Sequence, residues 1–276
     1  MIQGLSTEFP VQMLCQALSL GRSTYYYQPR DNDDLSVLSW IEDVLLRFPT
    51  YGCPRITEQL GRDGHKVNHK RVERILREND LIRVVKRKCK TTNSDHEYRR
   101  YSNLVRHLEV ARPDQVWCAD ITYVQMPRGF AYLAILLDVY TRGLRGWHLG
   151  QRLDTGLALT ALQKALSRGK PEIHHSDQGV QYAAYGYTDV LQDRGVRVSM
   201  SAVGRPTDNP YAERVIRTIK EEEVYLADYE SFAEAYRRIG HFIEDVYQTR
   251  RIHSSLGYLT PVEFEAAYWD TKQDTP

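Results

Sequence analysis

Apolar residues follow two different periods along the chain, and the period changes close to Pro113. Before it, apolar positions recur every three or four residues, as in residues 35–48, which is the spacing of an amphipathic helix. After it, apolar residues run together, as in FAYLAILLDVY at residues 130–140, which is typical of a buried strand. The pattern predicts an all-α front part followed by an α/β domain.

The front part is predicted to contain two groups of short helices. Their positions are residues 10–18, a short helix capped by Ser23, residues 35–48, residues 54–60 with Pro54 at the first position, and residues 69–79 capped by Asn68. The first two helices flank a turn at residues 19–21 and form a candidate helix-turn-helix. The later three match a DNA-reading helix-turn-helix, with the last as the recognition helix.

The last of these helices is basic on one side. Its predicted DNA-binding residues are Lys70, Arg71, Arg74 and Arg77, while Val72, Ile75 and Leu76 face inward. A small helical bundle with a solvated basic face would give the same pattern. Residues 83–90 follow with five basic residues in eight, and with Arg99 and Arg100 they form either a phosphate-contacting linker or an ordinary solvated one.

The back part alternates strands and helices. Strands are predicted at residues 115–124, 130–140, 144–149, 172–175 and 196–200. Helices are predicted at 154–167, at 183–194 and from residue 209 onward, where Asn209 is the expected cap and Pro210 lies in the first turn. This order predicts an α/β layered domain with a mixed sheet.

Composition narrows the class of protein. The chain contains no apolar run of the roughly 18–20 residues that span a bilayer. Its first residues show no basic segment followed by an apolar core, so secretion is not expected. Its four cysteines form no C-x-x-C pair, so a reducing cytoplasm is expected. Residues 1–112 carry 19 basic against 14 acidic side chains, and residues 113–276 carry 18 against 22. This asymmetry suggests a polyanion-binding front part joined to a domain that keeps carboxylates for another purpose.

Three carboxylates lie where an α/β sheet gathers its functional side chains. Asp120 is within the first strand, Asp177 directly follows the fourth, and Glu213 lies at the edge of an apolar helical stripe. Held together, they require a cation, and oxygen-only ligands favour Mg²⁺. Two such ions about 3.5–4 Å apart activate the attacking oxygen and stabilise the leaving one in phosphodiester chemistry.

The acidic residues of the helix that begins at Pro210 are expected to lie on different faces of that helix. Its stripe consists of Ala212, Val215, Ile216 and Ile219, and Arg217 and Lys220 share the face of Glu213. Arg214, Thr218 and Glu221 are expected to point away. The run Glu221, Glu222 and Glu223 is expected to be solvated or a helix-end acidic run, and Asp208 to be a capping or loop residue.

Other candidates have simpler interpretations. Asp138 ends an apolar strand and is expected to be structural, and Asp154 to be a helix cap. His174 and His175 are adjacent on a strand, so they point to opposite faces and cannot both ligate one ion; a direct catalytic role for His175 is the less favoured alternative. Contact with DNA and helix packing are equal possibilities for Tyr247, Arg250, Arg251 and His253.

Thirty-five residues separate Asp177 from Glu213, and four further motifs accompany this spacing. The motifs are W-x-x-D-I-T at residues 117–122, H-S-D-x-G-x-Q-Y at 175–182, D-N-x-x-A-E at 208–213 and R-x-H-S-S-L-G-Y-x-T-P at 251–261. In this order they resemble the OrfB transposases of the bacterial insertion-sequence-three family, within the retroviral integrase superfamily. The likeness covers nearly the whole chain, although Pro210 replaces a residue that is often alanine.

The resemblance implies an RNase H-like catalytic core with a mixed five-stranded sheet and flanking helices. It implies that Asp120, Asp177 and Glu213 are the catalytic triad and the ligands of two Mg²⁺ ions, which Mn²⁺ can replace. It also implies that Arg217 and Lys220 contact the DNA end. Such enzymes cut the 3′ ends of the element and join the freed hydroxyl to another phosphodiester. The expected domains are residues 1–30, 31–100 and 107–268.

The resemblance also implies partners. The expected ones are the terminal inverted repeats, target DNA, further copies of the chain, and an upstream reading frame as partner or fusion, with no membrane and a cytoplasmic, nucleoid-associated location. Two alternatives remain open from the sequence: a non-catalytic repressor derived from a transposase, and a metal-dependent nuclease without strand transfer.

Overall fold

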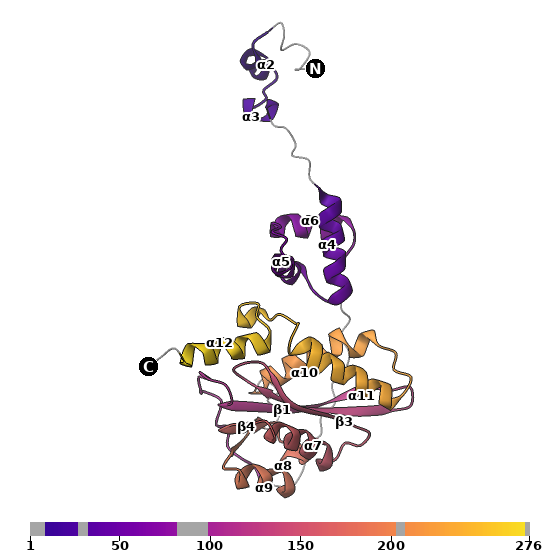
Figure 1. Ribbon diagram of the computed structural model, residues 1–276, viewed down its shortest axis with the longest axis vertical. Helices are drawn as coiled ribbons and strands as arrows, with labels where there is room; N and C mark the ends of the chain where they lie inside the picture. The colour runs from indigo at the N-terminus through magenta and orange to yellow at the C-terminus, as the bar shows by residue number, and fades with distance from the viewer. Residues whose placement is uncertain (1–8, 27–32, 82–98, 203–207, 274–276) are drawn as a thin grey trace.

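The computed structural model describes residues 9–26, 33–81, 99–202 and 208–273, and Figure 1 shows their arrangement. The basic run at residues 83–90 lies outside the described residues. In the described part, no helix is both long enough and apolar enough to cross a membrane.

The first two helices are α2 (Val11–Ala17) and α3 (Arg22–Tyr25). Ser19, at φ 53°, makes the turn between them. The residue that precedes α3 is Gly21, so the prediction that Ser23 caps this helix is wrong. The helix begins at Arg22, two residues earlier than a cap at Ser23 would indicate, and Ser23 lies inside it.

A three-helix domain follows, made of α4 (Asp34–Arg47), α5 (Cys53–Arg62) and α6 (His69–Glu78). The Asn68 side chain accepts a hydrogen bond of 2.9 Å from the Lys70 amide, which confirms the predicted cap. The three helices bury one apolar cluster, to which the inward residues of α6 contribute as predicted. The cluster contains Val37, Ile41, Val44, Phe48, Tyr51, Ile56, Leu60, Val72, Ile75 and Leu76.

A mixed five-stranded sheet forms the centre of the back part. Its strands are β1 (Val116–Gln125), β2 (Phe130–Asp138), β3 (Leu144–Gly150), β4 (Ile173–Ser176) and β5 (Arg197–Met200). The order is β3-β2-β1-β4-β5; the first three strands are antiparallel neighbours, and β4 and β5 run parallel to β1. This is the sheet of an RNase H-like core, so the predicted fold class is confirmed.

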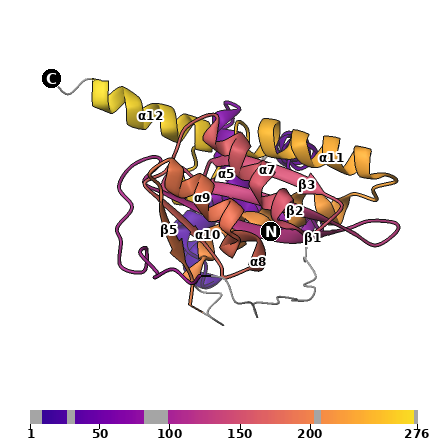
Figure 2. The same cartoon turned by 90° about the horizontal axis from the view of Figure 1, so that it is seen from below.

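Helices cover both faces of the sheet (Figures 1 and 2). On one face lie α7 (Thr155–Leu166), α8 (Val180–Ala183) and α9 (Tyr185–Asp193), which bury a cluster with Trp117 and Leu136. On the other face lie α10 (Pro210–Glu222) and α11 (Phe232–His241), which pack over Leu133 and Ile135. Side chains on the two faces of β2 therefore pack in two separate cores, as expected for a strand that is apolar throughout.

Two details of this layer depart from simple patterns. The helix predicted at residues 183–194 is α9, which begins only at Tyr185, because Ala184 adopts extended backbone at ψ 136° and separates α9 from the short helix α8 before it. Gly146 allows α7 to approach β3 closely, since a methyl group there would lie 2.4 Å from the carbonyl oxygen of Ala161.

The chain ends in further short helices. After α10 comes the 3₁₀ turn η2 (Val224–Leu226), and after α11 the π-helical turn η3 (Phe242–Tyr247). The turn η4 (Ser254–Leu256) and α12 (Pro261–Gln273) complete the chain. In Figure 2, α12 extends beyond the sheet.

Candidate active site

Asp120 lies on β1, and Asp177 directly follows the neighbouring parallel strand β4. Cys118 of β1 pairs with His175 of β4, and each aspartate lies two residues beyond its member of that pair. Since alternate residues of a strand share a face, the register brings both carboxylates to the same edge. The Asp120 carboxylate accepts a hydrogen bond of 2.7 Å from the Ile121 amide, and that of Asp177 accepts one of 2.9 Å from the Gly179 amide.

The small size of Gly179 matters in the segment between Asp177 and the start of α8. The φ of Gly179 is −63°, a conformation open to any residue, so the backbone there does not require a glycine. A methyl group at this position would lie 3.0 Å from the Asp177 carboxylate, so the glycine allows the carboxylate and the start of α8 to approach each other.

Glu213 lies in the first turn of α10 and is exposed, whereas the predicted stripe of Ala212, Val215, Ile216 and Ile219 is buried. Thr218, expected to face outward, is also buried. The buried face of α10 is wider than the stripe because later segments enclose its C-terminal half and supply Arg238 and Arg251 to it.

The three acids interact electrostatically. Burial, then the carboxylate of Asp177 and to a lesser degree that of Glu213, raise the pKa of Asp120 to about 8, and the Lys220 ammonium opposes them. Burial lowers the pKa of Lys220, and Asp120 partly restores it. The site thus holds negative charge that one lysine compensates only in part.

Two hydrogen bonds tie the start of α10 to the strands that carry the aspartates. The Asn209 side-chain amide lies 2.9 Å from the carbonyl oxygen of Ala119, the residue before Asp120. The His175 Nε2 lies 3.1 Å from the carbonyl oxygen of Asp208. The Asn209 side chain makes no capping bond to α10, so its predicted role as a side-chain cap is wrong: the tertiary contact to β1 takes its amide instead.

His174 and His175 have separate partners on opposite faces of β4. The ring of His175 contacts the Ser199 hydroxyl at 2.9 Å through Nδ1 and the Asp208 carbonyl through Nε2, so both ring nitrogens are occupied. His174 lies 2.9 Å from the Tyr187 hydroxyl within the other core. Because both ring nitrogens of His175 are engaged, a positioning role is favoured over ligation for this residue.

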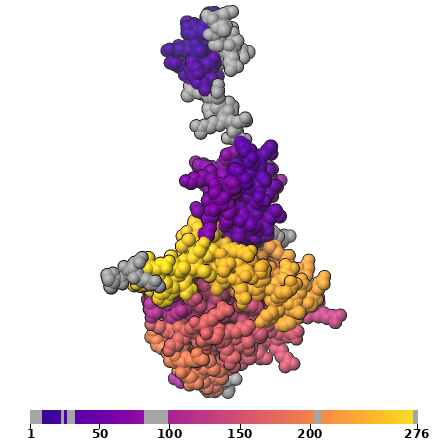
Figure 3. All heavy atoms as spheres, in the orientation of Figure 1, coloured from indigo at the N-terminus to yellow at the C-terminus, as the bar shows by residue number. Residues whose placement is uncertain are grey.

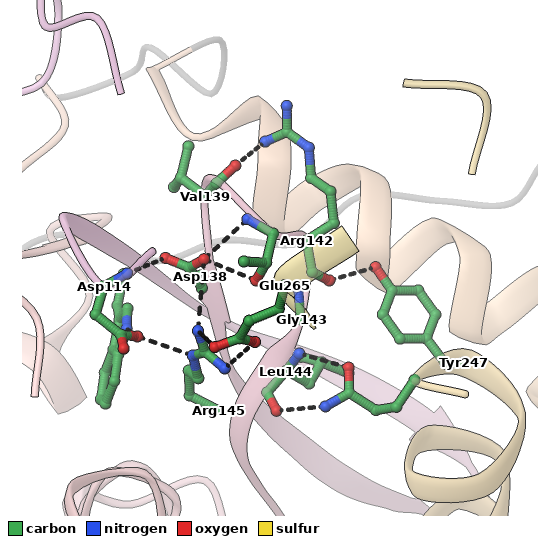
Figure 4. A network of polar contacts seen from close by, with 12 residues as sticks. Asp114, Asp138, Val139, Arg142, Gly143, Leu144, Arg145, Tyr247 and Glu265 are labelled. Atoms are coloured by element: carbon green, nitrogen blue, oxygen red, sulfur yellow. Dashed lines mark hydrogen bonds and ion pairs between the residues drawn. The ribbon is translucent and has the colours of Figure 1, made fainter. Parts of the chain in front are cut away.

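Asp138, the strongest rival acid, is structural as predicted (Figure 4). It is fully buried and accepts hydrogen bonds from the Asp114 amide at 3.0 Å and from the Thr141 amide and hydroxyl at 2.8 and 2.7 Å. Arg145 supplies a counter-charge at 3.7 Å. With its oxygens occupied in this way, Asp138 joins β2 to the turn before β3.

Glu222 and Glu223 lie at the end of α10, which agrees with the expected helix-end acidic run, but they are paired, so the solvated alternative is wrong for them. Glu222 accepts two hydrogen bonds of 2.7 Å from Arg251, and Glu223 accepts bonds of 3.1 Å from Arg238 and from Tyr229. The pair of Glu222 with Arg251 had one signal in the sequence. Arg251 begins the motif at residues 251–261 and directly precedes the apolar Ile252.

Asp208 is a loop residue, as expected. Its carboxylate accepts hydrogen bonds from the Asn103 side chain at 3.2 Å and from the Ala202 amide at 3.1 Å.

The predicted DNA-contacting residues differ in their surroundings. On α10, Arg217 is exposed and Lys220 half-buried. On α6, Arg71 and Arg74 form ion pairs of 2.8 and 2.7 Å with Asp34. Arg77 pairs at 3.1 Å with Glu73 on the same helix, and Lys70 is exposed. Two of the four basic side chains therefore brace α6 against α4, which their spacing alone did not reveal.

The donor set fits a hard divalent cation in its chemistry. All three candidate side chains offer carboxylate oxygens, and burial together with the neighbouring Asp177 carboxylate raises the pKa of Asp120, an effect that a bound dication would oppose. Among the residues that the structure describes, no three acids, histidines or cysteines are gathered closely enough to ligate one ion as they stand. Glu213 is the exposed member of the three.

Comparison with known proteins matches this architecture. Residues 110–206 and 194–261 match two family models that are each described as an integrase core domain, and residues 31–89 match an HTH-like domain. The core of human T-lymphotropic virus 2 integrase overlaps 56% of this chain and 97% of its own, at 13% identity and a TM-score of 0.46.

Relatives extend over the full chain. The transposase for insertion sequence element IS629 of Shigella sonnei is 30% identical over 98% of this chain and 96% of its own length. Transposase InsF for insertion sequence IS3A of Escherichia coli is 31% identical over 96% of both chains. The transposase for element IS904 of Lactococcus lactis is 34% identical over 78% of this chain and 87% of its own. With its HTH-like domain and its integrase core, the chain belongs to the IS3-family insertion-sequence transposases.

Proposed function

We propose that Asp120, Asp177 and Glu213 are the catalytic carboxylates of this transposase and that they hold two Mg²⁺ ions, which Mn²⁺ can replace. The observation that carries the proposal is the register of β1 and β4, which gives the two aspartates the same offset on adjacent strands. The bond from Asn209 to Ala119 supports it, because it fixes the start of the Glu213 helix beside Asp120.

In this proposal the protein supplies ligands and orientation. The bound ions would activate the attacking oxygen and stabilise the leaving 3′-oxygen. Asp120 acts as a carboxylate ligand and carries no proton in the reaction. Arg217 and Lys220, on the same helix as Glu213, bind the phosphates of the DNA end and orient it.

The same site performs two reactions in sequence. Water first attacks the phosphodiester at the element end, which releases a 3′-hydroxyl. That hydroxyl then attacks a phosphodiester of the target, so that one P–O bond forms as another breaks.

We divide the chain into residues 1–30, 31–100 and 107–268, with the first two parts binding the terminal inverted repeats. Joining requires two DNA ends, so a homodimer or larger assembly is expected, with an upstream reading frame as a further partner. Such a protein acts at the bacterial nucleoid in the cytoplasm.

A strand-transfer assay with element-end DNA and Mg²⁺ or Mn²⁺ tests the proposal. Wild type should yield joined products, and Glu213→Gln should yield none while still binding DNA. Glu221→Gln, on the same helix but outside the proposed triad, is the matched control and should remain active. Equal activity of Glu213→Gln and wild type would remove Glu213 from the triad.

The same assay separates the alternatives. Binding without cleavage by wild type, even with the upstream partner supplied, would indicate a repressor. Cleavage without joining would indicate a nuclease.

A further inference from the structure

The three-helix domain is attached to the catalytic core through a compact set of residues, which we call the domain junction: Tyr51, Arg55, Glu222, Arg251 and Ile252. The Ile252 amide donates a hydrogen bond of 3.1 Å to the Tyr51 hydroxyl. The Ile252 side chain is fully buried within the apolar cluster of α4, α5 and α6. Figure 3 shows this domain seated against the C-terminal part of the chain.

An ion cluster lies beside this apolar contact. Arg251 donates two hydrogen bonds of 2.7 Å to the Glu222 carboxylate, and Arg55 of α5 reaches the same carboxylate at 3.3 Å. The side chains of Arg251 and Glu222 are only 7% and 11% exposed. Such a bidentate pair, shielded from water, has one preferred geometry, so it holds Arg55 and its helix in a defined place.

A second attachment lies further along the chain. Arg62 donates to the carbonyl oxygen of Tyr258 at 3.2 Å and forms an ion pair with Glu263. These contacts do not involve Tyr51 or Arg55, so the three-helix domain stays attached when the domain junction alone is weakened.

The domain junction connects two functional elements by a short rigid path. Glu222 ends the same helix whose first turn carries Glu213, about 14 Å away along the axis. On the other side, Ile252 packs in the cluster that contains Val72 and Ile75 of α6. The orientation of α6 relative to Glu213 is therefore set by the domain junction.

We propose that Tyr51 and Arg55 are positioning residues that determine which phosphodiester of the DNA end reaches the catalytic carboxylates. The inference rests on the proposed function, with α6 bound to the terminal repeat. A fixed distance between α6 and Glu213 places one scissile bond at the site. If the domain junction loosens, neighbouring bonds reach the site and the intended one is misplaced.

A purely structural role makes a different prediction. It would lower stability and total activity together, and cleavage would remain at one position. A positioning role changes the distribution of cleavage positions at unchanged affinity for the terminal repeat.

The test uses the full-length protein with the double change Tyr51→Phe and Arg55→Gln. Phenylalanine keeps the ring stacked on Phe48, whose centroid is 4.5 Å away, and Glu222 keeps its pair with Arg251. The control is Arg47→Gln, which makes the same substitution in the same domain. Arg47 pairs with Asp63 of that domain, so this change leaves the domain junction intact. Tyr51→Phe with Arg55→Lys restores a cation beside Glu222.

Three measurements are compared: hydrogen exchange of the Ile252 amide, affinity for end-labelled terminal repeat DNA, and cleavage position at single-nucleotide resolution. The double variant should exchange Ile252 faster, bind DNA as wild type does, and spread cleavage over adjacent positions. Joining at the correct position should fall by up to about 100-fold, as misplacement by about 1 Å can produce. The control should match wild type, and the lysine variant should regain a single position.

Either of two results overturns the inference. One is wild-type protection of Ile252 in the double variant, because the domain junction would then not depend on these side chains. The other is faster exchange with cleavage still confined to one position. Failure of the proposed function gives a distinct result, since wild type itself would then make no joined product.

Discussion

The side-chain amide of Asn209 lies 2.9 Å from the carbonyl oxygen of Ala119 and joins the start of α10 to β1 just before Asp120. β1 pairs with β4 only as far as Cys118, so this contact lies where the strand pairing ends. The Ala119 carbonyl oxygen thus accepts its hydrogen bond from the start of the helix that carries Glu213, and not from β4. The link therefore serves both the fold and the relative placement of two proposed catalytic acids.

Replacing Asn209 with alanine should uncouple α10 from β1. The loss of one buried hydrogen bond should lower the free energy of unfolding by about 1–2 kcal/mol, measured by urea denaturation. Strand transfer should fall by about tenfold or more, because Glu213 loses its fixed approach to Asp120.

The control for this change is Asn79→Ala in the three-helix domain. Asn79 likewise donates to a backbone carbonyl, that of Ile75, at 2.9 Å. Asn79 is exposed, so the change should cost less stability than Asn209→Ala, and it should leave the chemistry of prebound DNA intact. Equal strand transfer by wild type and Asn209→Ala would show that the contact has no role in catalysis.

Glu222→Gln should destabilise the protein strongly. The change leaves the buried Arg251 guanidinium without its counter-charge, which should cost about 3 kcal/mol in the free energy of unfolding. Glu221→Gln is the neighbouring control, because Glu221 forms no ion pair with any residue within the described ranges. A pair of variants with equal urea midpoints would contradict a structural role for Glu222.

Much of the core follows from local chemistry. The strands and the α7 cap were predicted because apolar runs and a capping aspartate act over a few residues; the Asp154 side chain accepts a hydrogen bond of 3.0 Å from the Leu157 amide. The spacing of Asp177 and Glu213 predicted the site for a different reason. It is part of the set of motifs by which the chain resembles a known family.

The partners that the sequence did not reveal are distant in the chain. Glu222 pairs with Arg251, which lies twenty-nine residues later, and with Arg55 of another domain. The periodicity of a helix predicts neither contact. Asn209 was assigned a local capping bond because asparagine before proline usually makes one. Its actual partner, Ala119, became available only when the sheet was assembled.

Stability should fall as the solution is made acidic, in part because of His174. Burial, with a smaller contribution from His175, lowers the pKa of His174 from 6.5 to about 3. A histidine whose pKa is depressed by folding contributes stability that is present above pH 6.5 and is lost as pH falls toward 3. Between pH 7.5 and pH 5 the loss should be about 2 kcal/mol.

Urea denaturation at the two pH values measures this effect. His174→Gln keeps an acceptor for the Tyr187 hydroxyl and does not titrate, so the difference between pH 7.5 and pH 5 should shrink by about 2 kcal/mol. An unchanged difference would mean that His174 is accessible to protons in the folded protein.

Lys70 and Arg71 are neighbours on α6, but they should respond differently to substitution. Lys70 is exposed and forms no ion pair with any described residue, whereas Arg71 is paired with Asp34 at 2.8 Å. If α6 binds DNA, Lys70→Ala should lower the slope of log affinity against log salt by about one, because one phosphate contact is lost. Fluorescence anisotropy with terminal repeat DNA at several salt concentrations measures this slope.

Arg71→Ala is the matched comparison on the same helix. Its guanidinium braces α6 against α4, so the salt slope should stay near that of wild type while the thermal midpoint of unfolding falls. If Arg71→Ala instead lowers the slope as Lys70→Ala does, Asp34 releases Arg71 to DNA on binding, and the ion pair seen here belongs to the free protein alone. If neither change alters the slope, α6 does not contact phosphates.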